Sequence, residues 1–485
     1  MKLNKLILFT LLCTVMVISS CSDDDALSPI NQTRIQEDLA FDTPEKVVQQ
    51  VLGIYSGVKA GNFMGGRYYN YQDIRGEEFI NELSNQVTNS NTWAFLLASS
   101  TSEVNNLWQF GYYAINRSNV FIEGVENANI SSALKTNYIA EARYLRALSY
   151  FSLVTLYARP YWDGNGSKDG IPLRLKGEKE LGNSNLARAT VKQIYDQILL
   201  DLDFAETNLP LTYSSSYDRT TRAHRNTAIA LKTRVKLSMR DYPGVVTEAN
   251  KIVSTSAPFT ASSGVANALV PAIASAFVST AQTTENVFSF AFSSLDAPGT
   301  QNWLGYYWST LNGNNGEYSL ATTGIIANTG WKTTDARRSF LAVVSGKSYL
   351  QTKWQGGSSA VEYMQVIRYA EVLLNLSEAL VRSSNTIDTR AVALLNAVRQ
   401  RSDATTSFTV ASFASVQELL NQIAIERRIE LLGEGFRSLD VMRLGQDFAA
   451  KGSVSTVSVN SNLYIWPIPQ NELLYNKLAV QNPGY

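Results

Sequence analysis

Closely spaced carboxylates are the residues of this chain whose types best suit catalysis. Glu77, Glu78 and Glu82 lie within one short stretch, and hydrolysis of a glycosidic bond needs only two carboxyl groups about 5–9.5 Å apart. Acids on the exposed face of a helix have the same spacing, and this is the interpretation that we favour. Hydrolysis by these residues stays open as an alternative.

Other charged residues fit ion pairing better than catalysis. Opposite charges recur three residues apart in three places, Arg368 with Glu371, Arg427 with Glu430, and Glu434 with Arg437. Residues at this spacing are neighbours on the surface of a helix. We therefore predict structural ion pairs within each helix.

The composition excludes most other site chemistry. The 485 residues include one histidine, His224, and two cysteines, so a Ser-His-Asp or Cys-His site would depend on His224, and no His/Cys metal cluster can be built. His224 lies at the start of an expected helix, which favours a surface or capping role. Basic and acidic residues number 42 each, so the chain lacks the positive charge of a nucleic-acid-binding protein. We expect no cofactor and no metal site, while a metal ion held by carboxylates and carbonyls in a loop stays open.

Aromatic residues in two loop-rich stretches carry the prediction of a binding site. Aromatic rings with a few convergent polar groups suit an uncharged ligand, because a ring can stack on the apolar face of a sugar. The predicted ligand-binding residues are Tyr68, Tyr69, Asn70, Trp93, Trp303, Tyr306, Trp308 and Trp331. A second small hydrophobic core would use the same residues, and this alternative stays open. Trp108 and Tyr112 instead recur at helical spacing among apolar residues, which predicts core packing.

Amphipathic helices are expected to position these aromatic residues. Apolar residues recur at helical spacing in seven segments, over residues 44–58, 103–125, 134–157, 191–208, 222–239, 243–253 and 363–381, with a further helix over 388–401. Such helix pairs, each unable to bury its apolar face alone, predict a mostly α, tetratricopeptide-like scaffold. Two loop-rich inserts interrupt this scaffold. The first covers about 60–102 and has helical character only near 77–83. The second covers 254–359 and contains a predicted strand near 286–292. We expect a single compact body.

The chain begins with a pattern typical of export. An apolar run over residues 6–18 follows a basic start, and it is shorter than the ~20 residues that span a membrane, so residues 1–20 predict a signal peptide. Ile18-Ser19-Ser20-Cys21 resembles a bacterial lipobox, which predicts acylation (palmitate) of Cys21 and a lipidated tether over 21–40. Acyl chains hold a protein on a membrane surface without spanning it. Ordinary cleavage that leaves an unmodified cysteine is the alternative.

Five blocks in chain order carry a resemblance to a known family. They lie at 107–119, at 140–157 with Gly170-Ile171-Pro172-Leu173 following, at 366–375, at 425–440, and at 466–485, where the chain contains Trp466-Pro467-Ile468-Pro469. Together they resemble the SusD/RagB family of outer-membrane nutrient-binding lipoproteins, and residues 41–485 are identified as one SusD-like domain. Ser438 and Met442 stand where the family more often has an aromatic residue and an arginine.

The resemblance implies a function and a partner. It implies a surface-exposed, lipid-anchored protein of the outer membrane that captures a glycan or a related nutrient without catalysis. It also implies that the nutrient passes to a SusC-like TonB-dependent barrel, over which the lipoprotein acts as a lid. Two alternatives from other classes stay open, which are a surface glycoside hydrolase and a repeat protein for assembly or adhesion.

Overall fold

Helices are the main regular structure of the protein. The structure is a computed structural model, and it describes residues 40–485 except 181, 183, 355 and 357–360. The helices of eight or more residues that build the scaffold are α3 (Pro44–Val58), α6 (Ser102–Gly124), α7 (Ser132–Tyr157), α8 (Val191–Asn208), α10 (Arg225–Met239), α11 (Tyr242–Ala249), α13 (Tyr369–Ser384), α14 (Thr389–Ser402), α15 (Val416–Glu430) and α16 (Arg437–Leu444). The other α-helices are α4 (Arg67–Ile74), α5 (Ser90–Ala94), α9 (Ser216–Thr221), α12 (Leu304–Trp308) and α17 (Gln470–Tyr475).

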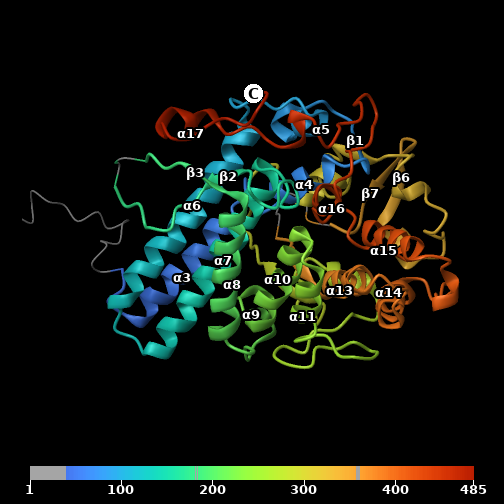
Figure 1. Ribbon diagram of the computed structural model, residues 1–485, viewed down its shortest axis with the longest axis horizontal. Coiled ribbons are helices and arrows are strands. Elements are labelled where there is room, and N and C mark those ends of the chain that lie inside the picture. The colour runs from blue at the N-terminus through green and yellow to red at the C-terminus, as the bar shows by residue number, and fades with distance from the viewer. Residues whose placement is uncertain (1–39, 181, 183, 355, 357–360) are drawn as a thin grey trace, which may run out of the picture.

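The long helices pack against one another nearly in chain order (Figure 1). α6 packs on α3 and α7, α7 on α8, and α8 on α10. The series continues through α11 and α13 to α14 and α15. Each helix therefore buries its apolar face against its neighbours, as the predicted scaffold of stacked helix pairs requires.

Local sequence explains where these helices begin and how closely they approach. Thr43 caps α3 and Pro44 occupies its first turn, while Thr190 and Gln193 form a capping box at the start of α8. At the contact between α6 and α7, a Cβ atom on Gly111 would lie 2.8 Å from a methyl group of Leu153. The absence of a side chain at Gly111 therefore allows the two helices to pack closely.

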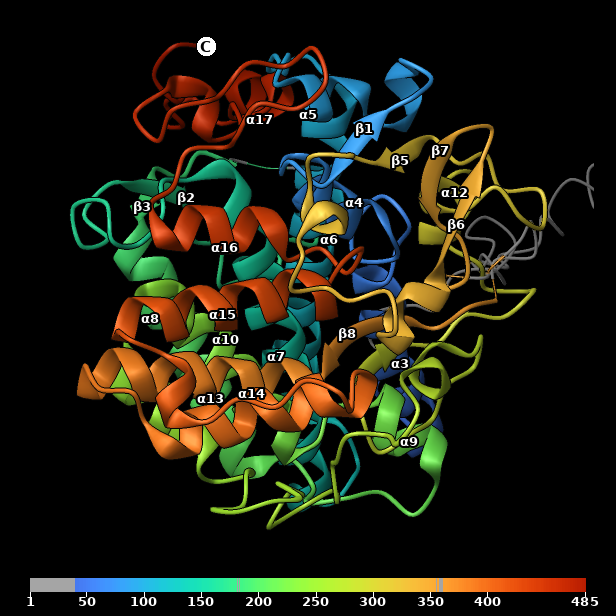
Figure 2. The same cartoon turned by 90° about the vertical axis from the view of Figure 1, so that its right-hand side faces the viewer.

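Short strands and loops form the remainder, beside the helical scaffold (Figure 2). The strands are β1 (Phe79–Asn81), β2 (Asp169–Pro172), β3 (Arg188–Thr190), β4 (Asn286–Phe290), β5 (Tyr318–Leu320), β6 (Leu341–Val344), β7 (Lys347–Leu350) and β8 (Met364–Arg368). They pair antiparallel as β1–β5, β2–β3, β4–β8 and β6–β7. The pairs β1–β5 and β4–β8 join segments far apart in the chain, so they tie the two loop-rich inserts to each other and to the scaffold.

Three local predictions were wrong. The helix expected over 363–381 begins only at Tyr369, because the apolar run before it forms β8 and pairs with β4. The segment 77–83 forms β1 instead of a helix, while the nearby Arg67–Ile74 is helical. The helix expected from residue 222 begins at Arg225, and His224 occupies its N-cap position.

The N-terminal predictions lie outside the described residues. The signal peptide, Cys21 and nearly all of the tether over 21–40 fall in the range 1–39. Among residues 40–485, apart from the gaps given above, no helix is both long and apolar enough to cross a membrane.

Candidate functional site

A pair of half-buried aromatic rings on α12 forms the candidate ligand-binding surface. Trp303, at the N-cap of α12, and Tyr306 lie edge to face, with ring centroids 5.3 Å apart and planes at 75°. The Trp303 indole Nε1 donates a hydrogen bond to Asn314 Oδ1 at 2.7 Å, and Gln301 Nε2 donates to the Tyr306 hydroxyl at 2.9 Å. Both rings are therefore fixed in orientation while part of each remains accessible.

Helix α4 holds the start of α12 in place. Arg67 Nε donates to Asn302 Oδ1 at 2.6 Å, and Asn302 Nδ2 donates to Pro298 O at 2.8 Å. The two segments approach so closely that a Cβ atom on Gly66 would lie 1.7 Å from the carbonyl oxygen of Asn302. Glycine at position 66 is thus required for the position of α12.

The other six predicted site residues are buried, with exposed fractions of 0–8%. They are Tyr68, Tyr69, Asn70, Trp93, Trp308 and Trp331. Trp308 stacks on Phe79 at a centroid distance of 4.1 Å, and Trp93 Nε1 donates to Phe79 O at 2.8 Å. A ring buried to this extent offers no free face for stacking. Trp308, which lies on α12 itself, instead anchors this helix in the core.

The environment of the pair supplies polar groups for an uncharged ligand. Asn312 and Asn315 are exposed on the turn that follows α12, and the backbone N–H of Asn315 donates to Tyr306 O at 3.2 Å. Burial, followed by the charge of Glu317, raises the pKa of Tyr306, so its hydroxyl stays protonated at neutral pH. Sequence reasoning missed Gln301, because a single glutamine in a loop carries no spacing signal.

The carboxylates considered for hydrolysis are engaged in ion pairs. Glu77 pairs with Arg437 at 2.7 Å, Glu78 pairs with Arg428 at 2.7 Å, and Glu82 contacts Lys347. Burial acts to raise the pKa of Glu77, but the neighbouring arginines outweigh it and hold that pKa below its usual value. A general acid of a glycosidase needs a raised pKa, so the environment of Glu77 opposes that role.

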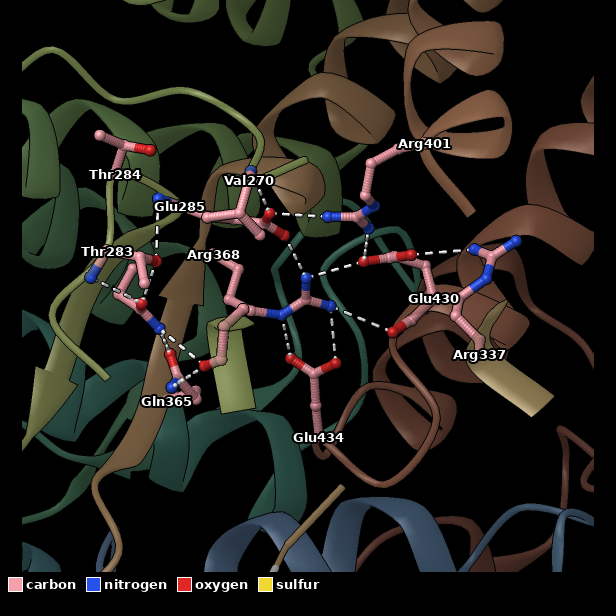
Figure 3. A network of polar contacts seen from close by, with 12 residues as sticks. Val270, Thr283, Thr284, Glu285, Arg337, Gln365, Arg368, Arg401, Glu430 and Glu434 are labelled. Carbon is pink, nitrogen blue, oxygen red and sulfur yellow. Dashed lines mark hydrogen bonds and ion pairs between the residues drawn. The ribbon is translucent and has the colours of Figure 1, made fainter. Parts of the chain in front are cut away.

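The charged residues near the C-terminus form a buried network, but not with the predicted partners (Figure 3). Arg368 contacts Glu285 at 2.6 Å, Glu430 at 2.7 Å and Glu434 at 2.7 Å. Arg401 also contacts Glu285 and Glu430. The predicted pairing of Arg368 with Glu371, and the other two pairings within a helix, were wrong because these side chains point into the interior, where long-range partners compensate their charge.

The network balances its charges and supports the α12 region. Its five acids and five bases are Glu285, Asp335, Glu426, Glu430, Glu434, Arg337, Lys353, Arg368, Arg399 and Arg401. Lys353 Nζ donates to Glu434 Oε1 at 2.7 Å and to Leu432 O at 2.8 Å, and the adjacent Trp354 Nε1 donates to Gly433 O at 3.0 Å. A Cβ atom on Gly433 would lie 3.7 Å from the indole nitrogen of Trp308. The loop that the network fixes is therefore in contact with α12.

His224 is buried instead of lying at the surface. Its Nε2 lies 3.2 Å from Val287 O, and burial lowers its pKa to about 4. The imidazole is thus neutral at physiological pH, and the capping position agrees with one of the two roles expected from the sequence.

Comparison with known proteins matches nearly the whole chain to one family. Residues 25–237 match a family described as starch-binding and associating with the outer membrane, and residues 275–485 match the SusD family. A SusD superfamily structure from Bacteroides fragilis is 30% identical, with a TM-score of 0.81 over 90% of this chain and 99% of that chain. The protein belongs to the SusD family, as the sequence blocks predicted.

Two further relatives cover nearly the whole chain. SusD-like protein P2 of Formosa agariphila is 24% identical, and the match covers 100% of both chains. A structure described as a laminarin-binding SusD-like protein is 21% identical, with a TM-score of 0.71 over 92% of this chain and 100% of that chain. The second likeness shows the shared fold.

Proposed function

We propose that the protein is a glycan-binding lipoprotein of the outer membrane that captures its ligand on the Trp303–Tyr306 surface. The observation that carries this proposal is the fixed edge-to-face pair of half-exposed rings bordered by amides and a neutral hydroxyl. Such a surface suits a neutral, polyhydroxylated ligand, because rings contact the apolar faces of sugars while amides bind hydroxyl groups. The laminarin-binding description of one neighbour supports the same ligand class.

The proposal includes anchoring by acylated Cys21 and transfer of the glycan to a SusC-like TonB-dependent transporter. The family description that refers to the outer membrane supports this location. Transfer requires modest affinity, because a ligand held too tightly is not released. The protein acts without catalysis, and the engagement of Glu77, Glu78 and Glu82 in ion pairs supports this part of the proposal.

Calorimetry with soluble glycans tests the binding surface. We expect laminarin or another neutral glucan to bind, and we expect Trp303→Ala to weaken that binding at least tenfold. Tyr113→Ala is the matched control, because Tyr113 is 48% exposed on α6 and should not affect binding. Equal affinity of the Trp303→Ala variant and the native protein would refute the assignment of the surface.

Purification of the tagged lipoprotein from native outer membranes in mild detergent tests the partner. Recovery of a stoichiometric TonB-dependent barrel is the expected result. Recovery of the lipoprotein alone would refute the transfer step and leave the binding step standing. Release of reducing sugar from the bound glycan would refute the non-catalytic assignment.

A further inference from the structure

A ligand-sized cavity, separate from the Trp303–Tyr306 surface, lies between α6, α17 and the segment after β2. Its volume is about 360 Å³, near the lower end of the range of about 300–1,000 Å³ that is typical of small-molecule sites. It shares no lining residue with the Trp303–Tyr306 surface, and Figure 2 shows α17 and α12 well apart along the upper edge of the molecule. One wall is a stripe along α6 that includes Asn105, Gln109, Tyr112 and Asn116.

Hydrogen bonds hold the walls of this cavity in place. Asn116 Nδ2 donates to Glu178 O at 2.8 Å, and Asn116 Oδ1 accepts from Glu178 N at 2.7 Å. Asn119 Nδ2 donates to Arg174 O at 3.0 Å. On the other side, Trp108 Nε1 donates to Glu472 Oε2 at 3.2 Å, which ties α17 to α6. These bonds fix the walls of the cavity, which lowers the entropic cost of binding.

The charged groups of the cavity are already paired with one another. One terminal nitrogen of Arg174 contacts Glu178. The other terminal nitrogen lies 3.6 Å from Glu472 Oε1 and donates a hydrogen bond to Ser184 O at 2.6 Å. Glu472 also accepts from Asn476 Nδ2 at 2.7 Å. Each charged side chain therefore has a partner, and the excess of one acid over the single base disfavours an anionic ligand. A neutral ligand fits these paired charges.

Polar and aromatic groups remain available to such a ligand. Gln109 is exposed, and its side-chain amide makes no hydrogen bond within the described part of the chain. Tyr475 lines the cavity with 70% of its surface exposed, and the half-buried ring of Tyr112 lies on the α6 wall. Tyr112 donates its hydroxyl to Pro172 O at 2.7 Å, which fixes the ring. An exposed ring beside a free amide is the combination that binds a sugar ring.

We propose that this cavity is a second carbohydrate-binding site, which takes one or two neutral sugar rings independently of the Trp303–Tyr306 surface. Its volume limits the enclosed part of the ligand to one or two rings, which suits a chain end or a short oligosaccharide. The proposal goes beyond the function proposed above, because it adds a site whose occupation does not require the surface on α12.

The experiment is calorimetry with laminaripentaose, maltopentaose, cellopentaose and mannopentaose. Two variants change the cavity. The first combines Gln109→Ala with Tyr475→Ala, and the second is Gln109→Trp, whose larger side chain fills the cavity mouth. A third variant combines Trp303→Ala with Tyr306→Ala and changes the surface on α12. At least one of these oligosaccharides should bind the native protein, and both cavity variants should weaken one binding event at least tenfold. The Trp303/Tyr306 variant should retain that event. Circular dichroism confirms folding of each variant, and Tyr113→Ala is the control.

The outcomes separate the two proposals. Unchanged binding of every oligosaccharide by both cavity variants overturns the second site and leaves the surface on α12 unaffected. Loss of all binding in the Trp303/Tyr306 variant also overturns it, because the cavity then binds nothing by itself. Loss of oligosaccharide binding in the cavity variants alone supports the second site. If the Trp303/Tyr306 variant then binds as tightly as the native protein, the proposed role of Trp303 is refuted. Binding of none of the four probes overturns the second site.

Discussion

Removal of Arg368 tests whether the buried ion network stabilises the protein. The Arg368 side chain is 1% exposed, and its partners Glu285, Glu430 and Glu434 are 0–3% exposed. Loss of one partner from a buried ion pair costs about 3–5 kcal/mol, because the remaining charge stays buried without compensation. Arg368→Met leaves three carboxylates with one cation fewer, so we expect the free energy of unfolding to fall by at least about 3 kcal/mol in urea denaturation.

A matched variant and a double variant make this prediction specific. Arg382→Met removes a partner of Glu378 that is 25% exposed and four residues away, and Arg443 still pairs with Glu378. We expect this change to cost less than about 1 kcal/mol. Arg368→Met combined with Glu434→Gln removes a charge of each sign, so its cost should be less than the sum of the two single costs. Additive costs, or a loss below about 1 kcal/mol for Arg368→Met, would refute the reasoning.

Three further predictions concern pH and packing. The pKa of His224 is lowered to about 4 from 6.5 by burial, so its contribution to stability, up to roughly 3 kcal/mol, is complete above pH 6.5 and is lost as the pH falls through 4. The single imidazole resonance in the NMR spectrum should titrate near pH 4, and titration near 6.5 would contradict the burial. Burial acts to raise the pKa of Glu378, but the charges of Arg443 and Arg382 outweigh burial and lower this pKa to about 2. Its stabilising contribution is therefore present above about pH 4.5 and lost as the pH falls towards 2, and Glu378→Gln should flatten the acid limb of a stability–pH curve. Gly66→Ala places a Cβ atom 1.7 Å from Asn302 O, so it should displace α12 and weaken glycan binding in calorimetry, while an unchanged affinity would show that the contact is not needed.

Helix periodicity predicted the scaffold because each long helix has one apolar face. The segment 191–208 forms α8 with the predicted bounds, since a capping box precedes it and Pro210 follows. Periodicity failed where a strand lies directly before a helix. Residues Met364–Arg368 are apolar enough to continue the pattern of α13, but they form a strand that pairs with β4. Because β4 lies nearly 80 residues earlier in the chain, the local sequence around Met364–Arg368 does not reveal this partner.

The network illustrates a second limit of sequence reasoning. Opposite charges three residues apart predicted pairs within helices, yet Arg427 pairs with Asp440 at 3.1 Å and Arg234 pairs with Glu371 at 2.6 Å. Spacing along a helix identifies neighbours only for side chains on the same exposed face. For side chains that point inwards, tertiary packing selects the partner, and that choice is not encoded locally.

The aromatic residues show why a binding surface is harder to predict than a core. Trp303 and Trp308 are separated by little more than one helical turn, and composition cannot distinguish them, yet Trp308 stacks on Phe79 while Trp303 keeps part of its ring accessible. The buried ring has a structural consequence for the accessible one. Because α12 rests on Trp308 and is held by Asn302, the Trp303–Tyr306 pair is ordered before a ligand arrives, and binding loses little conformational entropy. Affinity then depends mainly on the small area of two rings, and this modest affinity is what the proposed transfer of a glycan to a transporter requires.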